Sequence, residues 1–199
     1  VGDSAEAWAK SIGKILAFKG KATKFILDLS QLRPAGQRLS GYGWISSGDA
    51  PLAKAFTAIV QILNKKSGQL LGKIDILDIM NWLGTVLSSR RSAEIALAYY
   101  DTPEWEAFAR AKDDLNKFPH RSQSNNSVVF WRKPTDEELQ DFFNIVQESG
   151  GSEPGLINGE AARKRAPWFT GVNPCAEILL GNKSFCNLSE VDLSKFRND

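Results

Sequence analysis

The sequence has few of the residues that build metal centres or disulfide frameworks. Its 199 residues include two cysteines, one histidine and one methionine. A tetrahedral zinc site needs four ligands, usually cysteine and histidine, so we expect no metal site. A structural disulfide is also unexpected in a reducing cytoplasm. The two thiols are therefore either inert side chains or groups that take part in chemistry.

Long hydrophobic runs and an excess of one charge are also missing. No apolar run approaches the roughly 18 residues of a membrane-spanning helix, and no secretion signal opens the sequence. The 25 Lys and Arg residues nearly balance 23 Asp and Glu residues, leaving a net charge of +2. Such a charge gives no strong field to attract nucleic acid or an anionic membrane. We expect a cytoplasmic globular protein without nucleic-acid or membrane partners.

Hydrophobic periodicity predicts alternating helices and strands. Helices are predicted over residues 5–18, 52–66, 74–88 and 104–117, with another beginning near residue 135. Runs rich in β-branched or aromatic residues predict strands near 24–29, 94–97 and 127–131. No repeat or linker divides the chain. This alternation favours an α/β fold with parallel strands.

Two polar segments and a lone histidine are less specific. Residues 39–51 form a loop rich in glycine and serine, of a length that is often functional. Arg90 and Arg91 follow a small polar turn, where a solvated basic pair is the simplest interpretation. His120 has no second histidine or acidic pattern near it in the sequence, so we expect a structural or surface role.

The stretch that contains both cysteines carries the most chemistry. Asn173 and Pro174 favour a turn just before Cys175, because proline restricts its own backbone and that of the preceding residue. Glu177 is close enough to share a small cavity with the thiol, as a reaction that needs sulfur and a base requires. Cys186 follows eleven residues after Cys175. The alternative is that both cysteines are small buried side chains.

The extended pattern around Cys175 resembles a known family. Asn-Pro-Cys-x-Glu-Ile-x-Leu at 173–180, followed by Cys-Asn-Leu at 186–188, is similar to the finger loop of class II ribonucleotide reductases, which depend on adenosylcobalamin. Proline after the asparagine is the class II form, since class I enzymes usually carry leucine there. The family usually has glycine where this chain has Ala176. That difference raises a question about the backbone angles of the loop.

The resemblance continues through most of the chain. Residues 28–36 (Asp-Leu-Ser-x-x-Arg-Pro-x-Gly), followed by Ser-Gly-x-x-Pro-Leu at 47–52, look like the segment with the first specificity loop. Residues 90–97 (Arg-Arg-Ser-Ala-Glu-Ile-Ala-Leu) look like the second. Residues 124–128 (Ser-Asn-Asn-Ser-Val) match a barrel strand of the family. The turn cluster at residues 150–155 (Gly-Gly-Ser-Glu-Pro-Gly) corresponds to the Gly-Glu-Pro-Gly of the monomeric branch that reduces ribonucleoside triphosphates.

The fold that the resemblance implies is about half of a ten-stranded α/β barrel, with the finger loop passing through its centre. Residues 1–199 would be a partial catalytic domain. Residues 1–100 would hold the effector site and the specificity loops. Residues 101–199 would hold a barrel strand, the finger loop and the strand that follows.

The chemistry that the resemblance implies is radical reduction of a ribonucleotide to a 2′-deoxyribonucleotide. Adenosylcobalamin would supply the radical that turns Cys175 into a thiyl, which removes the 3′ hydrogen of the ribose. Glu177 would take the proton of the 3′-hydroxyl, and Asn173 would hold that hydroxyl by its amide. Cys186 would supply half of the dithiol that reduces the intermediate.

The resemblance also implies an effector site and several partners. Asp3 and Arg33 fall where the family binds the ribose and phosphates of a deoxynucleotide effector, and Arg90 and Arg91 fall in the second specificity loop. The partners would be a ribonucleoside triphosphate substrate, a deoxynucleotide effector, a thioredoxin-type reductant and the remainder of the reductase chain.

Two further interpretations stay open at this stage. In the family, the partner of Cys186 and the cysteine pair that receives electrons lie outside this segment, so we expect these residues alone to be incomplete and inactive. The segment could instead be an inactive nucleotide-binding module derived from a reductase. A class I relative is a weaker third possibility, against which Pro174 and the cysteine spacing speak.

Overall fold

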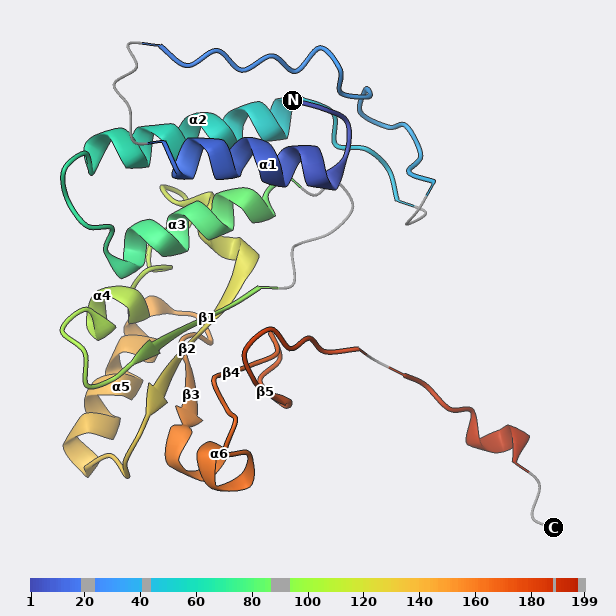
Figure 1. The fold of residues 1–199 in the computed structure, drawn as a ribbon. Helices are drawn as coiled ribbons and strands as arrows, with labels where there is room; N and C mark the ends of the chain where they lie inside the picture. The colour runs from blue at the N-terminus through green and yellow to red at the C-terminus, as the bar shows by residue number, and fades with distance from the viewer. Residues whose placement is uncertain (19–23, 41–43, 87–93, 188, 197–199) are drawn as a thin grey trace.

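The computed structural model describes residues 1–18, 24–40, 44–86, 94–187 and 189–196. Three helices form a layer beside a small parallel sheet, and further helices and a hairpin cover the faces of that sheet (Figure 1). In chain order the elements are α1 (Ala5–Leu16), α2 (Ala50–Lys65), α3 (Lys73–Gly84), β1 (Glu94–Tyr99), α4 (Trp105–Ala109), η1 (Pro119–Gln123), β2 (Ser124–Phe130), α5 (Asp136–Ser149), β3 (Gly155–Asn158), α6 (Gly159–Arg165), β4 (Gly171–Val172), β5 (Leu179–Leu180) and η2 (Leu193–Lys195).

The main sheet has three parallel strands in the order β1-β2-β3. Glu94 lies opposite Ser124, and Ser127 lies opposite Gly155. The central strand ends in a continuous apolar run, residues 128–130, that is buried throughout, as expected for a parallel strand covered on both faces. The predicted α/β class with parallel pairing is confirmed. The ten-stranded barrel stays a prediction.

Each face of the sheet packs against its own hydrophobic core. Val128 and Phe130 point to one face and pack with Phe142 and Ile145 of α5. Leu97 of β1 points to the other face, because side chains alternate along a strand. There it belongs to a cluster that includes Val172 of β4. The β4–β5 hairpin therefore lies on the face opposite α5, where Figure 1 also shows it.

The spacing of apolar residues and the capping of helix ends explain why these segments are helical. Leu52, Phe56 and Ile59 are buried along one side of α2, at intervals of three and four residues. Thr135 caps α5 by accepting a hydrogen bond from the Glu138 amide, and the Glu138 carboxylate accepts one from the Thr135 amide. Within the described ranges, no helix combines the length and the apolar character that crossing a bilayer requires.

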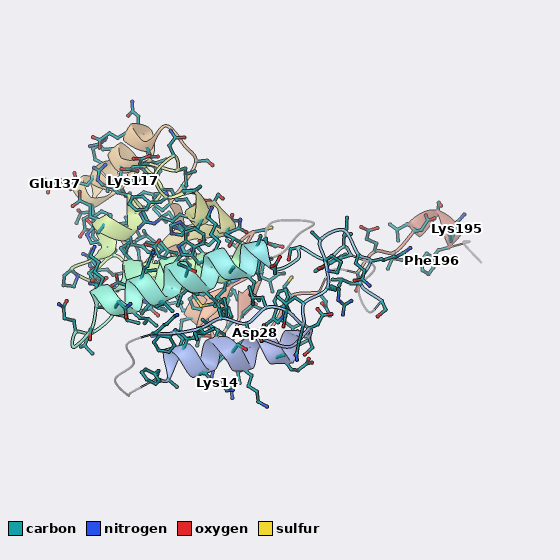
Figure 2. The ribbon with its side chains drawn as sticks, turned by 90° about the horizontal axis from the view of Figure 1, so that it is seen from above. Lys14, Asp28, Lys117, Glu137, Lys195 and Phe196 are labelled. Carbon is teal, nitrogen blue, oxygen red and sulfur yellow. The ribbon has the colours of Figure 1, made fainter. Side chains whose placement is uncertain are left out.

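Several elements of the structure differ from those predicted from the sequence. Residues 24–29 do not form the predicted strand, and Ile26 is 81% exposed. A β-prone run needs a partner strand, whereas this one runs extended past α1, close to Lys14 (Figure 2). The helix predicted over 104–117 ends at Ala109 and gives way to turns. In α3, helical spacing predicts a core stripe of Ile76, Ile79, Met80, Leu83 and Leu87, of which Leu87 lies outside the described residues. Ile79 is buried, as is Leu77, but Ile76 and Met80 are each 51% exposed.

Candidate active site and effector site

The Cys175 segment is the turn of the β4–β5 hairpin. Val172 lies opposite Leu179, and the Asn173 amide donates to the Ile178 carbonyl at 3.2 Å. Inside the turn, the Ala176 amide donates to the Asn173 carbonyl at 2.8 Å. Cys175 is exposed on this turn. The expectation that Cys175 is presented on a loop is therefore met.

Asn173 joins the base of this turn to the second cysteine. Its side chain is buried, with 4% exposure. Its Oδ1 accepts a hydrogen bond from the Ile178 amide at 2.9 Å, and its Nδ2 donates to the Cys186 sulfur at 3.7 Å. Two residues predicted for the site are thus in direct contact. Glu177, two residues after Cys175, is exposed.

Ala176 holds the turn in an unusual backbone conformation. Its φ is +65°, in the left-handed region that residues with a Cβ rarely adopt. Glycine adopts this conformation without that steric cost. The position at which the reductase family usually has glycine therefore has a glycine-like backbone here, although the residue is alanine.

Asn125 is a contact of the turn that the sequence analysis did not single out. Its Nδ2 donates to the Pro174 carbonyl at 2.7 Å, which connects β2 to the residue before Cys175. The signal in the sequence is the polar run at 124–127, which opens a strand whose other residues are apolar. Polar side chains are unusual in a buried parallel strand, so such a run marks a possible site.

The predicted effector residues are also brought together. The Arg33 Nε donates to Asp3 Oδ2 at 2.6 Å, and both side chains are partly exposed. A guanidinium has five N–H donors, so this contact leaves others to bind phosphate oxygens. Next to Asp3, Ser4 caps α1 by accepting from the Ala7 amide at 3.1 Å.

The predicted first specificity segment contacts the chain shortly before the second one. The Ser47 hydroxyl, in the predicted first loop, donates to the Val86 carbonyl at 2.7 Å. Val86 directly precedes residues 87–93, so the predicted residues Arg90 and Arg91 lie outside the described residues. The described part of the second segment resumes at Glu94, the first residue of β1.

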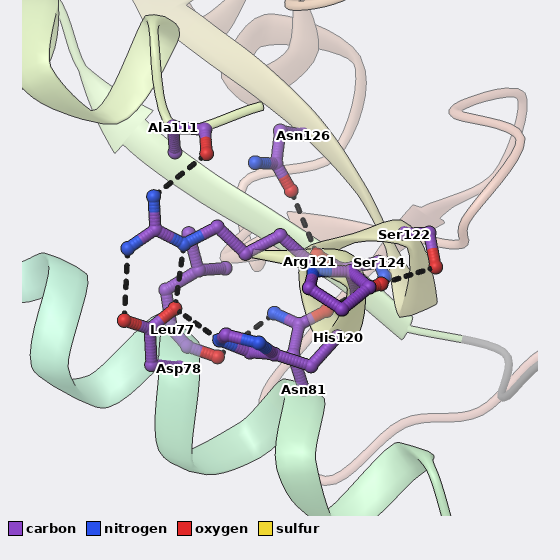
Figure 3. A network of polar contacts seen from close by, with 10 residues as sticks. Leu77, Asp78, Asn81, Ala111, His120, Arg121, Ser122, Ser124 and Asn126 are labelled. Atoms are coloured by element: carbon purple, nitrogen blue, oxygen red, sulfur yellow. Dashed lines mark hydrogen bonds and ion pairs between the residues drawn. The ribbon is translucent and has the colours of Figure 1, made fainter. Parts of the chain in front are cut away.

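A buried polar cluster anchors α3 to the start of β2 (Figure 3). Arg121 donates through Nε to Asp78 Oδ1 at 2.6 Å and through Nη2 to Oδ2 at 2.8 Å. His120 donates from Nε2 to the same carboxylate at 2.8 Å, and its ring stacks on Trp82 with centroids 4.5 Å apart. The structural role expected of His120 is consistent with this position. The sequence did not predict Asp78 as the partner of His120, because the two residues lie 42 positions apart.

The environment of Asp78 favours its charged form. Burial alone would raise the pKa of its carboxyl group, but the hydrogen bonds from Arg121 and His120, together with the positive charge of Arg121, hold the pKa below its usual value. Asn81 extends the cluster by accepting from the Ser124 amide at 2.9 Å. The start of β2 is therefore fixed to α3 by polar contacts.

The exposed sulfur of Cys175 fits chemistry with a group that binds outside the described elements. A thiol at the tip of a turn is accessible to such a group, and the buried Asn173 beneath it keeps the turn in place. This arrangement agrees with a cofactor that acts on Cys175. Among the described residues, none is identified as a binding residue for that cofactor.

Comparison with known proteins places the chain in a family. Residues 1–63 match a family model described as "B12-dependent ribonucleotide reductase, insertion domain". Relatives from Lactobacillus gasseri and Lactobacillus helveticus are each 34% identical over 95% of this chain. A relative from Levilactobacillus brevis is 36% identical over 86% of it. All three are named adenosylcobalamin-dependent ribonucleoside-triphosphate reductase.

The match covers only part of each relative. The chain spans 27% of the Lactobacillus gasseri protein and 24% of the Levilactobacillus brevis protein. The comparison with solved structures found no match. The alignment nevertheless runs through nearly the whole chain, in agreement with the motifs around Cys175. The chain therefore belongs to the B12-dependent ribonucleotide reductase family, as a segment of about a quarter of the length of its relatives.

Proposed function

We propose that this segment is the central part of the catalytic domain of an adenosylcobalamin-dependent ribonucleoside-triphosphate reductase. The observation that supports it most is the hairpin turn, in which Cys175 is exposed and Asn173 contacts Cys186. Residues 1–100 would carry the effector site and specificity segments. Residues 101–199 would carry the barrel strands and the finger loop. The barrel would be completed by further segments of the reductase.

The proposed reaction uses Cys175 as the hydrogen-abstracting residue. Adenosylcobalamin, when bound, supplies the radical chemistry that converts the Cys175 thiol into a thiyl. Cys175 removes the 3′ hydrogen of the substrate ribose, which requires its sulfur in van der Waals contact with that atom. Glu177 accepts the proton of the 3′-hydroxyl, which eases loss of the 2′-hydroxyl as water.

Asn173 and Cys186 complete the proposed site. The Asn173 amide has two N–H groups, and one donates to Cys186, so the second can hold the substrate hydroxyl. Cys186 provides one thiol of the pair that reduces the intermediate, and a thioredoxin-type protein regenerates the pair. Such free thiols suit the reducing cytoplasm, where we place the protein.

Asp3, Arg33 and the second specificity loop form the regulatory part of the proposal. Arg33 would bind the phosphates of a deoxynucleotide effector, and Asp3 its ribose. Arg90 and Arg91 would pass effector identity to the substrate site. The Ser47–Val86 hydrogen bond supports this idea, because it joins the first specificity segment to the residue that leads into the second.

The test of catalysis is cobalamin-dependent reduction of a ribonucleoside triphosphate with a dithiol. We would assay these 199 residues alone and joined to the segments that the relatives contain in addition. We expect deoxynucleotide product only from the completed protein, and none after Cys175→Ser or Glu177→Gln. Ser184→Ala, a change at an exposed residue of the same region, is the matched control.

The alternative is a nucleotide-binding module without catalysis. The Asp3–Arg33 pair supports it equally well, since effector binding does not need Cys175. Binding of a deoxynucleoside triphosphate by equilibrium dialysis separates the two functions. Arg33→Ala should weaken this binding about tenfold or more, because charge-assisted hydrogen bonds to phosphate are strong. Intact binding together with an inactive completed protein would favour the module.

A further inference from the structure

We propose that Asn125 is a positioning residue, which sets the location of the Cys175 sulfur through the carbonyl of Pro174. The inference rests on the proposed function of Cys175 and goes beyond it, because it assigns a role to a residue on a different element. Asn125 lies on β2, 50 positions before Cys175 in the sequence. The contact that carries the inference is the 2.7 Å hydrogen bond from Asn125 Nδ2 to the Pro174 oxygen.

The accepting oxygen belongs to the peptide bond that links Pro174 to Cys175. A peptide unit is planar and rigid, so fixing its oxygen also restricts the amide nitrogen and the Cα of the next residue. The donor thus acts on the backbone of Cys175, one peptide plane away from the sulfur. The bond does not involve the sulfur, and Cys175 as a residue is exposed.

The donor is itself held firmly on both sides. Before it, the Ser124 amide donates to Asn81 Oδ1 at 2.9 Å. After it, the Asn126 amide donates to Glu153 Oε2 at 3.0 Å, and Lys112 pairs with the same carboxylate at 2.7 Å. Asn125 also lies in register with Ile95 of β1. The side chain therefore projects from a part of the strand that four separate segments fix.

The hydrogen bonds within the turn do not remove the strain in its backbone. A contact from outside the hairpin is therefore needed to hold the turn in place. The Ala176 amide donates to the Asn173 carbonyl, and the Ile178 amide donates to Asn173 Oδ1. All of these groups belong to the hairpin, and Ala176 has a φ of +65°. Relaxation of this strain would shift the adjacent Cys175. A displacement of about 1 Å at a reacting group can cost roughly a hundredfold in rate.

Hydrogen exchange in the 199-residue chain tests the contact directly. Asn125→Asp keeps the shape of the side chain but removes its N–H donor at neutral pH. We expect exchange at the Ala176 and Ile178 amides to become about three- to tenfold faster, as the loss of one ordinary hydrogen bond predicts. The Val128 and Val129 amides, farther along β2, should change less than twofold. Asn125→Ala should act in the same direction.

The matched control is Asn126→Ala, a change of the same residue type at the next position. Asn126 is buried, accepts from the Ser124 hydroxyl at 2.8 Å and points to the opposite face of the sheet. This variant should speed exchange along β2 without a preference for the turn. The proposal is overturned if Asn125→Asp leaves the turn amides as protected as in the unchanged chain, or affects them no more than the β2 amides.

Kinetics of the completed reductase provide the functional readout. Asn125→Asp should lower kcat by about ten- to a hundredfold and leave the KM for the nucleotide within twofold, because the sulfur and not the substrate is displaced. An unchanged kcat would overturn the positioning role. An enzyme that stays active after Cys175→Ser would instead refute the proposed function, and the exchange experiment would still decide whether Asn125 holds the turn.

Discussion

At the scale of single residues, Asn173 connects the two parts of the proposed chemistry. The sequence suggests that its amide holds a substrate hydroxyl, and in the structure the same amide contacts both Ile178 and Cys186. Its burial explains why the turn keeps its shape although Cys175 and Glu177 are exposed. These roles were predictable in part, because the motif marks Asn173 and Cys186 but cannot reveal that they touch.

The backbone of Ala176 leads to a prediction about stability. Ala176→Gly should leave the free energy of unfolding unchanged or raise it by up to about 1 kcal/mol, since relief of left-handed strain exceeds or offsets the extra entropy of glycine in the unfolded chain. Ala9→Gly, at an exposed position within α1, should instead lower it by about 1 kcal/mol. Urea denaturation measures both. Equal losses would contradict the expectation.

Asp78 leads to a prediction about pH. Asp78→Asn should lower the free energy of unfolding by about 3 kcal/mol at pH 7, because Arg121 loses its buried charged partner. The pKa of Asp78 in the folded protein lies below its ordinary value of 3.8. The contribution is therefore complete above about pH 4 and disappears as the pH falls through the lower folded pKa.

Denaturation curves between pH 7 and pH 2 would check the Asp78 prediction. The difference between the unchanged chain and Asp78→Asn should shrink below about pH 4. Asp141→Asn, at an exposed position of α5, is the control and should change stability by less than about 0.5 kcal/mol. A difference that stays constant over this range would show that the ion pair is not its source.

At the scale of elements, the close approach of α6 to the sheet depends on one glycine. A Cβ at Gly159 would lie 2.7 Å from Trp131 Cε3 and from Val129 Cγ1. Trp131 is further held by Arg163, whose guanidinium lies 4.1 Å from the centre of the indole ring. The first residue of α6 therefore fits against the end of β2 only without a side chain.

Gly159→Ala should consequently destabilise the protein by about 1–3 kcal/mol, the usual effect of overpacking a buried contact. Gly13→Ala provides the opposite control. Gly13 lies inside α1, and a Cβ added there would meet no atom within 4 Å, so alanine should stabilise the helix by about 0.5–1 kcal/mol. Thermal unfolding of both variants checks the pair. Two changes of the same sign would contradict this account of α6.

The sequence predicted elements well where a local pattern decides them. The apolar spacing of residues 52–66 and 74–88 predicted α2 and α3, with small errors at the ends. The strand predicted at 24–29 was wrong, because strand formation depends on a partner that local composition cannot supply. The helix predicted to residue 117 was too long, since turns begin at Arg110 without any proline or glycine to signal them.

At the scale of the whole molecule, the C-terminal residues extend away from the body, as Lys195 and Phe196 show in Figure 2. Val191, Leu193 and Phe196 are 65%, 78% and 67% exposed. Ending the chain at Asn187 should therefore change the free energy of unfolding by less than about 0.5 kcal/mol. Ending it at Leu180 should cost more, because Cys186 no longer contacts Asn173. Urea denaturation would compare them, and a large loss at Asn187 would contradict this.

Long-range contacts were the part of the molecule that the sequence could not provide. The pairing of Asp78 with His120 and Arg121 joins segments more than forty residues apart. The motif around Cys175 identified the family, but the contact of Asn125 with Pro174 depends on how β2 and the hairpin pack. Family resemblance predicted which residues belong to the site, and only the structure could add the neighbours that hold them.

The division of β2 into a polar half and an apolar half has a consequence for evolutionary drift. Val128 and Phe130 pack against apolar side chains of α4 and α5, so a change there can be compensated by repacking those helices. Residues 124–126 are tied by hydrogen bonds to α3, Glu153 and the Cys175 turn. A substitution in this half needs matched changes in segments far apart in the chain. The first half of β2 should therefore vary more slowly between species than the second.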